Sequence, residues 1–304
     1  MTHTIKFAGV NFNRNGVLAS GILGVTGSSM IKTAQGGAGG ITCKSISKNF
    51  RKGHPTPVLQ VFKHGVINAV GLSSTGVDNS NNELRNVKNN SDAVVIASVF
   101  GGTEIEFKET IEELDSSVYD IIELNISCPN VADEFGHAFA NSPHSASNVM
   151  RIARSATNKP IIVKLSPNYP NIGLIAKACE DAGADGITAI NTVGPGMLID
   201  INTFQPKLTN KVGGVSGPAI LPIAIRAVYD IYKAVTIPII GMGGITEVED
   251  AIQMIAVGAQ LYGVGTGILY HGIDIFNTIN TGIDEYLREK NLQYDDLVGI
   301  VHKQ

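Results

Sequence analysis

The sequence is poor in cysteine. Only three occur among 304 residues, Cys43, Cys128 and Cys179, and they lie far apart. None belongs to a Cys-x-x-Cys pair, so the sequence supports neither a disulfide scaffold nor a cysteine-rich metal site. Such sparse and unpaired cysteines fit a reducing compartment, and we expect a cytoplasmic protein.

Long runs of like charge and long apolar runs are also lacking. The net charge is −4 at pH 7, which gives no general attraction to nucleic acid or to acidic membranes. No apolar run approaches the roughly 20 residues of a transmembrane helix. The first residues, MTHTIKFAGVNFNRNG, lack the apolar core of a signal peptide. We therefore expect a soluble protein that binds neither nucleic acid nor membranes.

Glycine, with 34 residues, and short apolar runs are abundant. Eight β-rich runs alternate with stretches of helical periodicity. Several runs are continuously apolar, which is typical of parallel strands covered on both faces. The runs span residues 16–20, 39–45, 93–101, 120–127, 160–167, 186–191, 237–245 and 261–267. They predict an α/β fold, a (β/α)8 TIM barrel formed by residues 1–304 as one domain, with an open doubly wound sheet as the alternative.

The stretches between the strands carry signals of helix ends and of insertions. Residues 145–158 begin with Ser145 as a cap candidate, and residues 171–183 end in Gly183, which suits the position after a helix. Residues 50–75 do not fit the repeat and predict an inserted hairpin. Residues 131–145 predict an active-site lid loop, with Gly136 as a candidate hinge.

Lysines and glycines stand where several predicted strands end. Active sites of such barrels lie at the C-terminal ends of the strands. Lys44 and Lys164 follow or interrupt apolar strands, and two lysines at one rim favour a negatively charged ligand. Residues 243–244 and 265–266 form glycine turns after the last two strands, where these barrels usually bind phosphate. Each turn alone is a weak signal, because glycine turns are also common for steric reasons.

The fourth predicted strand ends in NISCPN, residues 125–130. Asn125 and Asn130, with Asn191 after the sixth strand, suit a planar ligand with amide or imide edges, although an asparagine also commonly caps a turn. A free cysteine is most often a small buried hydrophobe, and we assign that role to Cys43 and Cys179. For Cys128 we favour a catalytic thiol.

The segment NISCPN resembles the catalytic motif of the class 1 dihydroorotate dehydrogenases. Further segments match that family in order and spacing: LASG at 18–21, CKS at 43–45, NAVGL at 68–72, VKLSPN at 163–168, AINT at 189–192, GGVSGPAI at 213–220, GMGGI at 241–245 and GVGTG at 263–267. The resemblance implies a (β/α)8 barrel that holds FMN and oxidises dihydroorotate to orotate in de novo pyrimidine (UMP) biosynthesis.

The resemblance also implies roles for individual residues. Cys128 would be the general base that accepts the substrate proton while a hydride passes to N5 of FMN. The substrate would be bound by Lys44, Asn68, Asn125, Asn130, Asn191 and Thr192. FMN would be bound by Ala19, Ser20, Gly21, Lys44, Asn125, Lys164, Gly217, Gly243, Gly244, Gly265 and Thr266. No metal is expected.

Within class 1 the sequence is more like subtype 1B than 1A, because of the long loop that ends in HAFANSP. This likeness implies a partner subunit that carries FAD and an iron–sulfur cluster and passes electrons to NAD. The assembly would be a homodimer or a heterotetramer. Two departures weaken the subtype assignment: GLSSTG at 71–76, and Asp133 with Glu134 in the lid. The fumarate-using subtype is the alternative.

Two other functions are compatible with parts of the sequence. One is a flavin enzyme that resembles the dihydropyrimidine dehydrogenases and acts on uracil-like rings, but Asn130 stands where that group has histidine. The other is a phosphate-binding barrel without redox chemistry, which would leave the Cys128 motif unexplained.

Overall fold

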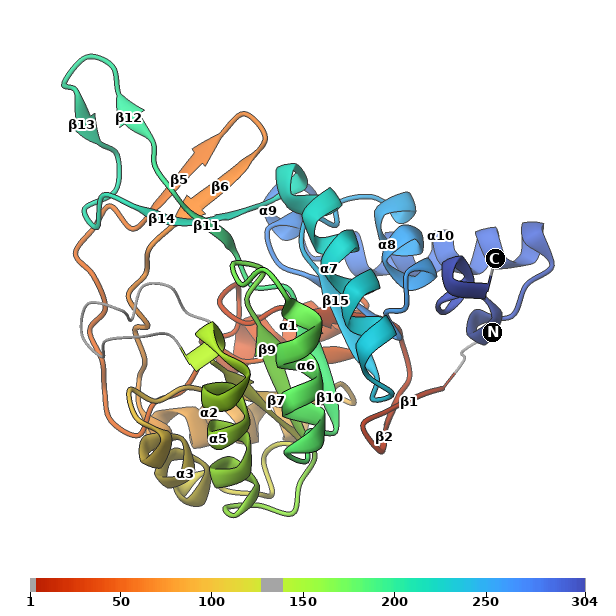
Figure 1. Cartoon of the computed structure of the whole chain (residues 1–304), viewed down its shortest axis with the longest axis horizontal. Coiled ribbons are helices and arrows are strands. Elements are labelled where there is room, and N and C mark those ends of the chain that lie inside the picture. Colours follow the sequence, from red (N-terminus) through yellow and green to blue (C-terminus); the bar gives the residue numbers. More distant parts are fainter. Residues whose placement is uncertain (1–3, 127–138, 304) are drawn as a thin grey trace.

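A closed barrel of eight parallel strands forms the centre of the computed structural model, which describes residues 4–126 and 139–303 (Figure 1). The barrel strands are β3 (Gly16–Leu18), β4 (Gly40–Thr42), β7 (Val94–Val99), β8 (Ile121–Asn125), β9 (Ile161–Leu165), β10 (Gly186–Ala189), β15 (Ile239–Met242) and β16 (Leu261–Val264). Each strand pairs with the next barrel strand along the chain, and β16 closes on β3. The predicted (β/α)8 barrel is therefore confirmed, and the open-sheet alternative is wrong.

Helices surround the barrel on its outside (Figure 1). They are α1 (Gly27–Gln35), α2 (Val77–Asn90), α3 (Glu104–Glu113), α5 (Pro143–Arg154), α6 (Ile172–Asp181), α7 (Leu221–Ala234), α8 (Val248–Ala256), α9 (Gly267–His271), α10 (Ile275–Lys290) and α11 (Tyr294–Leu297), with 3₁₀ turns at Phe139–Asn141, Pro218–Ile220 and Ile300–Lys303. Each longer helix buries one apolar stripe against the barrel; in α7 this stripe includes Ala224, Val228 and Ile231. Within the described ranges no helix combines the length and hydrophobicity needed to cross a membrane.

Two helix ends test the predicted caps. The start predicted at Ser145 is wrong, because α5 begins at Pro143 and Ser142 is its cap: the Ser142 Oγ accepts the Ser145 N–H at 3.1 Å. Proline suits the first helical position, where no N–H is needed. The predicted lid loop, residues 131–145, therefore ends before Pro143, and its residues 131–138, with Gly136, lie outside the described part of the chain. Gly183 follows α6 as predicted, with φ of +98°.

A short antiparallel hairpin that the sequence did not predict closes the N-terminal end of the barrel. Its strands are β1 (Ile5–Phe7) and β2 (Val10–Phe12). Phe7 and Phe12 are fully buried, and their rings meet edge to face at 5.9 Å. A Cβ on Gly40 would lie 2.7 Å from the Phe12 ring, and one on Gly186 would lie 3.0 Å from the Phe7 ring. Glycines on two barrel strands thus make room for this aromatic plug.

A second sheet lies across the opposite, C-terminal end of the barrel, with strand order β11–β14–β6–β5 (Figure 1). Its strands are β5 (Leu59–Phe62), β6 (Gly65–Asn68), β11 (Val193–Gly196) and β14 (Gly213–Ser216). The hairpin predicted within residues 50–75 is confirmed as β5 and β6. Its pairing with β14, which places Asn68 opposite Gly214, was not predicted.

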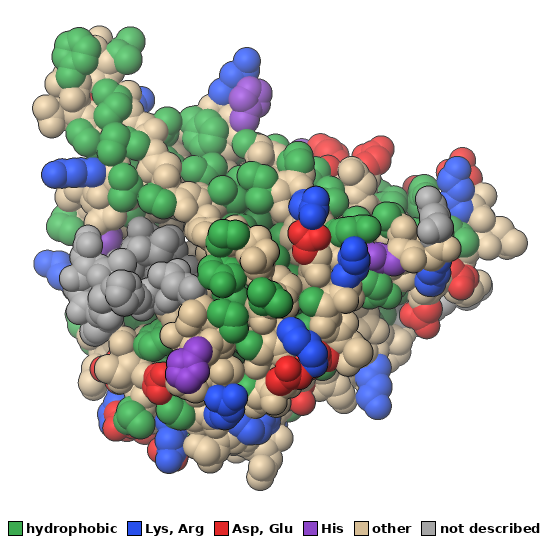
Figure 2. Space-filling view, in the orientation of Figure 1, with side chains coloured by type: hydrophobic (Ala, Val, Ile, Leu, Met, Phe, Trp, Pro, Cys, Tyr) green, Lys and Arg blue, Asp and Glu red, His purple; other side chains and the backbone are tan. Residues whose placement is uncertain are grey.

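An arm between β11 and β14 stands out from the molecule (Figure 1). Its two short strands are β12 (Ile199–Asp200) and β13 (Gln205–Pro206). Apolar side chains gather on this arm in the space-filling view (Figure 2), and both Ile201 and Phe204 are 79% exposed. Exposed apolar clusters of this kind are typical of contact surfaces between proteins.

Candidate functional site

A cavity of about 400 Å³ opens at the C-terminal end of the barrel, between the strand ends and the second sheet. Its size is typical of sites for small ligands and cofactors. Every described residue of the predicted site lines this cavity: Ala19, Ser20, Gly21, Lys44, Asn68, Asn125, Lys164, Asn191, Thr192, Gly217, Gly243, Gly244, Gly265 and Thr266. Cys128 and Asn130 lie outside the described residues.

Two lysines meet at this cavity, as the sequence predicted. Lys164 belongs to β9, where all five residues are buried, and its own side chain is only 5% exposed. It has neither a hydrogen bond nor an ion pair to any residue of the described ranges. Lys44 follows β4 by two residues and is half-buried. The described lining contains these two ammonium groups and no carboxylate, so the cavity favours an anionic ligand.

A chain of side-chain amides and hydroxyls crosses the cavity wall. The Asn125 Nδ2 donates to the Ser45 Oγ at 3.0 Å, and the Asn191 Nδ2 donates to the Asn125 Oδ1 at 3.5 Å. The Asn191 Oδ1 accepts the Thr192 N–H at 2.9 Å. These contacts orient both amides, so the wall presents fixed donors and acceptors to a ligand.

Ser45 lines the cavity and Ser98 contacts it from β7, but both were missing from the predicted set. The Ser45 Oγ lies 3.0 Å from the Ser98 Oγ and 3.3 Å from the Ser20 Oγ, and it also accepts from Asn125. Ser45, which lines the cavity, therefore links the ends of β3, β7 and β8. Signals for both were available, because Ser45 ends the CKS segment and Ser98 is a polar residue within an apolar strand.

Asn168 supports the site from the loop after β9. Its Nδ2 donates to the Thr192 carbonyl at 3.3 Å, and its Oδ1 accepts the Gly194 N–H at 2.9 Å. Both contacts hold the segment that leaves β10 and enters the second sheet. Asn168 ends the VKLSPN segment, but its role was not predicted.

The glycine turns after β15 and β16 contain glycine for different reasons. Gly243 and Gly244 have φ of +125° and +84°, and a Cβ on Gly244 would lie 2.6 Å from the Leu221 backbone N. Gly265 has no positive φ, and the nearest atom to an added Cβ is the Ala19 Cβ at 3.4 Å. Neither conformation nor protein packing therefore requires glycine at position 265, whereas close approach of a ligand would.

The same turns present donors to the cavity. The backbone N–H groups of Gly243, Gly244 and Gly265 make no hydrogen bond within the described part of the chain. The Thr266 Oγ1 donates to the Ser216 Oγ at 2.8 Å, which ties the last turn to β14. Backbone N–H groups that converge in a turn form an anion site, as phosphate-binding loops do.

Two cysteines are packed residues, as predicted. Cys43 and Cys179 are free and buried, and burial raises the pKa of each thiol to about 12. Both thiols are therefore protonated at neutral pH and lack the thiolate that cysteine chemistry requires.

Comparison with known proteins identifies the family. The family model "Dihydroorotate dehydrogenase" matches residues 2–287. The chain therefore belongs to the dihydroorotate dehydrogenase family of oxidoreductases. Within that family its similarity is to class 1B, as the sequence predicted.

Several relatives carry the name "Dihydroorotate dehydrogenase B (NAD(+)), catalytic subunit". The protein from Methanocaldococcus jannaschii is 42% identical over 301 residues, which cover 98% of this chain and 97% of that protein. The protein from Pyrococcus horikoshii is 41% identical over 300 residues, with 98% and 97% covered. The fold of Eimeria tenella DHODH, solved in complex with ferulenol, matches with a TM-score of 0.84 at 20% identity, covering 99% of this chain and 89% of that one.

Proposed function

We propose that the protein oxidises dihydroorotate to orotate in pyrimidine biosynthesis, with FMN at the mouth of the barrel and residues 1–304 acting as one domain. One observation carries this proposal: every described residue of the predicted site lines one cavity, although these residues come from segments spread along the chain. Membership of the dihydroorotate dehydrogenase family supports it and speaks against both alternatives, the dihydropyrimidine dehydrogenase-like enzyme and the barrel without redox chemistry.

The residues at the mouth fit FMN. The free N–H groups of the glycine turns suit its phosphate, which Gly217, Gly243, Gly244, Gly265 and Thr266 would hold. Ala19, Ser20, Gly21, Lys44, Asn125 and Lys164 would surround the ring. When bound, the flavin supplies the hydride acceptor at N5. The ammonium of Lys164 would stabilise the negative charge that gathers on a ring receiving a hydride.

The polar wall of the cavity fits dihydroorotate. Lys44 would pair with its carboxylate, and the amides of Asn68, Asn125, Asn191 and Asn130, with Thr192, would bind the ring amides. Asn125 and Asn191 already orient each other, which favours one substrate pose. Cys128 would take the proton at its Sγ while the hydride leaves from the neighbouring carbon, and the two steps together balance the oxidation.

We also propose a partner. The named relatives are catalytic subunits, and we infer that this chain passes electrons to a separate subunit with FAD and an iron–sulfur cluster, and from there to NAD. The assembly would be a homodimer or a heterotetramer in the cytoplasm. The exposed apolar arm, with Ile201 and Phe204, supports contact with another chain.

An anaerobic spectrum of the purified protein tests the catalytic proposal. We expect flavin absorbance that bleaches when dihydroorotate is added. The Cys128→Ala variant should retain FMN but bleach at least about a hundredfold more slowly, as expected for loss of a general base. Cys179→Ala, the same change at a buried helical thiol, should bleach like the unmodified protein. A protein that cannot bind FMN, or bleaching that is unaffected in Cys128→Ala, would contradict the proposal.

A further inference from the structure

Side chains that point into a (β/α)8 barrel form layers of four, contributed by alternate strands. The strand registers assign the inward side chains of this barrel to such layers. The layer nearest the cavity consists of Ala19, Ser98, Lys164 and Met242. The layer below consists of Thr42, Glu123, Thr188 and Gly263. The next layer, Val17, Ile96, Ile162 and Ile240, is entirely apolar.

The middle layer is polar and unpaired. Glu123 and Thr42 are 1% exposed, and Thr188 is fully buried. The Glu123 Oε1, the Thr42 Oγ1 and the Thr188 Oγ1 each lack a hydrogen-bond partner among the residues that the structure describes. Buried polar groups in proteins are nearly always paired, so a whole layer of unpaired ones requires an explanation. A buried carboxyl is the costliest member, because it loses its hydration without gaining a partner.

Lys164 is the nearest cationic residue above this layer on the neighbouring strand. Asn125 is in register with Lys164, and Glu123 precedes Asn125 by two residues on the same face of β8. The carboxyl thus lies diagonally below the lysine, on the side away from the cavity. The ammonium and the carboxyl are farther apart than a direct ion pair, but both are buried in the barrel, where charges are screened less than in water.

We propose that Glu123 is a positioning residue for Lys164: its carboxylate balances the lysine charge from below and holds the ammonium at the cavity floor. The inference rests on the proposed FMN site. There, Lys164 would face the flavin, and Glu123 would act on the flavin only through Lys164.

The FMN reduction potential tests this role, because a merely structural residue would not shift it. We expect Glu123→Gln to lower the equilibrium constant for two-electron reduction of FMN about tenfold, which corresponds to a reduction potential about 30 mV lower. Lys164→Gln should lower it at least as much, and the double variant no further than Lys164→Gln alone. Glu123→Asp keeps the charge, so its reduction potential should be close to that of the unmodified protein. Glu285→Gln removes an exposed carboxylate from α10 and should leave the potential unchanged.

Two results would overturn the inference. A potential that rises in Glu123→Gln would mean that the carboxylate acts on the flavin directly, and additive shifts would mean that the two residues act independently. Failure of the proposed function looks different, since no variant would then bind FMN.

Thermal unfolding of the FMN-free protein tests the pair without any cofactor. Each single variant should lower the Tm, because it leaves one buried charge without its counterpart. The decrease in Tm of the double variant should be smaller than the sum of the decreases in the two single variants. Additive decreases would count against the pairing. The double variant also keeps the test open if Glu123→Gln alone does not fold.

Discussion

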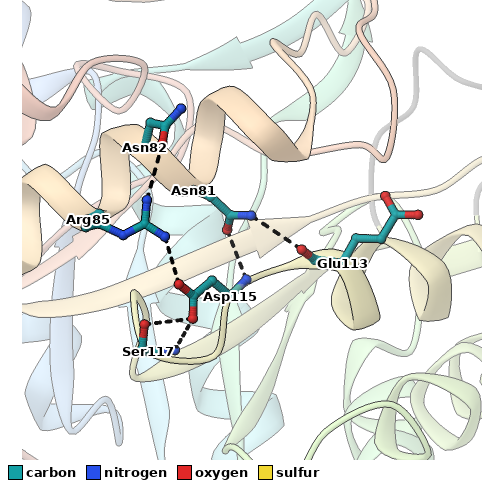
Figure 3. A network of polar contacts seen from close by, with 6 residues as sticks. All are labelled: Asn81, Asn82, Arg85, Glu113, Asp115 and Ser117. Carbon is teal, nitrogen blue, oxygen red and sulfur yellow. Dashed lines mark hydrogen bonds and ion pairs between the residues drawn. The ribbon is translucent and has the colours of Figure 1, made fainter.

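The polar groups between α2 and the segment that follows α3 are paired with one another, whereas several polar groups inside the barrel and at its glycine turns lack a partner among the described residues. On the outside, the Arg85 Nη2 donates to the Asp115 Oδ2 at 2.8 Å, and the Arg85 Nη1 donates to the Asn82 Oδ1 at 3.2 Å (Figure 3). Asn81 bridges the same two segments: its Oδ1 accepts the Asp115 N–H at 3.0 Å, and its Nδ2 donates to the Glu113 carbonyl at 3.3 Å. This outer network lies at the surface, and most of its contacts are exposed.

The difference separates two uses of polar residues. The outer network joins two helical segments and contributes to the fold, and each group there has its partner in the chain. At the cavity, the Lys164 ammonium and the N–H groups of the glycine turns lack partners among the described residues, and so does the Glu123 Oε1 in the layer below. Unpaired polar groups cost stability, so those that line the cavity indicate a bound ligand there, and Glu123 would serve that ligand through Lys164.

The largest expected effects come from substitutions in the glycine turns. There, a loss of folding stability can be separated from a loss of affinity for the ligand. Gly244→Ala should lower the free energy of unfolding of the FMN-free protein by about 1–3 kcal/mol, because φ is +84° and the Cβ would meet Leu221. Gly265→Ala should change that free energy by less than about 0.5 kcal/mol. It should nevertheless weaken FMN binding about tenfold, or about 1.4 kcal/mol, since the methyl group enters the cavity. Thermal unfolding and fluorescence titration measure the two quantities.

Normal FMN binding by Gly265→Ala would contradict this contrast between the two turns. It would show that the ligand does not approach position 265.

A middle-sized effect is expected from two buried threonines that differ in pairing. Thr188→Val removes an unpaired hydroxyl. It should leave the free energy of unfolding unchanged or raise it by about 1 kcal/mol at most. Thr110→Val removes a hydroxyl that donates to the Glu106 carbonyl at 2.6 Å, and it should lower stability by about 1 kcal/mol. Both side chains are fully buried, so the pair isolates the hydrogen bond. Equal losses in the two variants would show that Thr188 has a partner.

The smallest effect is expected from Asp115 in the outer network. The O–H and N–H of Ser117, followed by Arg85, lower the pKa of Asp115 from 3.8 to about 2. Since the folded pKa is depressed, its stabilisation is present above about pH 4 and is lost as the pH falls toward 2. Urea midpoints of the unmodified protein and Asp115→Asn should therefore differ at pH 5–7 and converge as the pH falls to 2.

Ser117→Ala provides the control for this titration. It keeps the carboxylate but removes the O–H donor at 2.7 Å, so the loss of stability on acidification should begin at a higher pH. A difference between unmodified protein and Asp115→Asn that is constant from pH 7 to 2 would show that the carboxylate charge contributes nothing.

The barrel could be predicted from the sequence because each of its strands is a short, local and largely apolar run. Every predicted run contains its barrel strand, and the glycines and lysines at the strand ends predicted the rim of the cavity. The second sheet could not be predicted in the same way. Its strand β11 reads Val-Gly-Pro-Gly, a composition that strands usually avoid, and its neighbour β14 pairs with β6 from far earlier in the chain.

The interior of the barrel shows a second limit of the sequence. Glu123 was visible as a charge within the apolar run DIIELNIS, on the same face as Asn125. Its neighbours Thr42 and Thr188 follow only from the registers of the barrel strands, which the sequence does not fix. The aromatic plug was missed because β1 and β2 are only three residues long, and the glycines that receive it are ordinary strand residues until the barrel is closed.

The closure of β16 on β3 joins the last barrel strand to the first. During synthesis β3 leaves the ribosome early and β16 near the end, and β6, which pairs with β5 at once, must wait for β14 to cover its other edge. The nascent chain therefore carries both edges of an open sheet until translation is nearly complete. Residues 265–269, which follow β16, contain the last residues of the described cavity lining to be made. A chain that ended before β16 would therefore lack this part of the cavity wall, and with it part of the proposed FMN site.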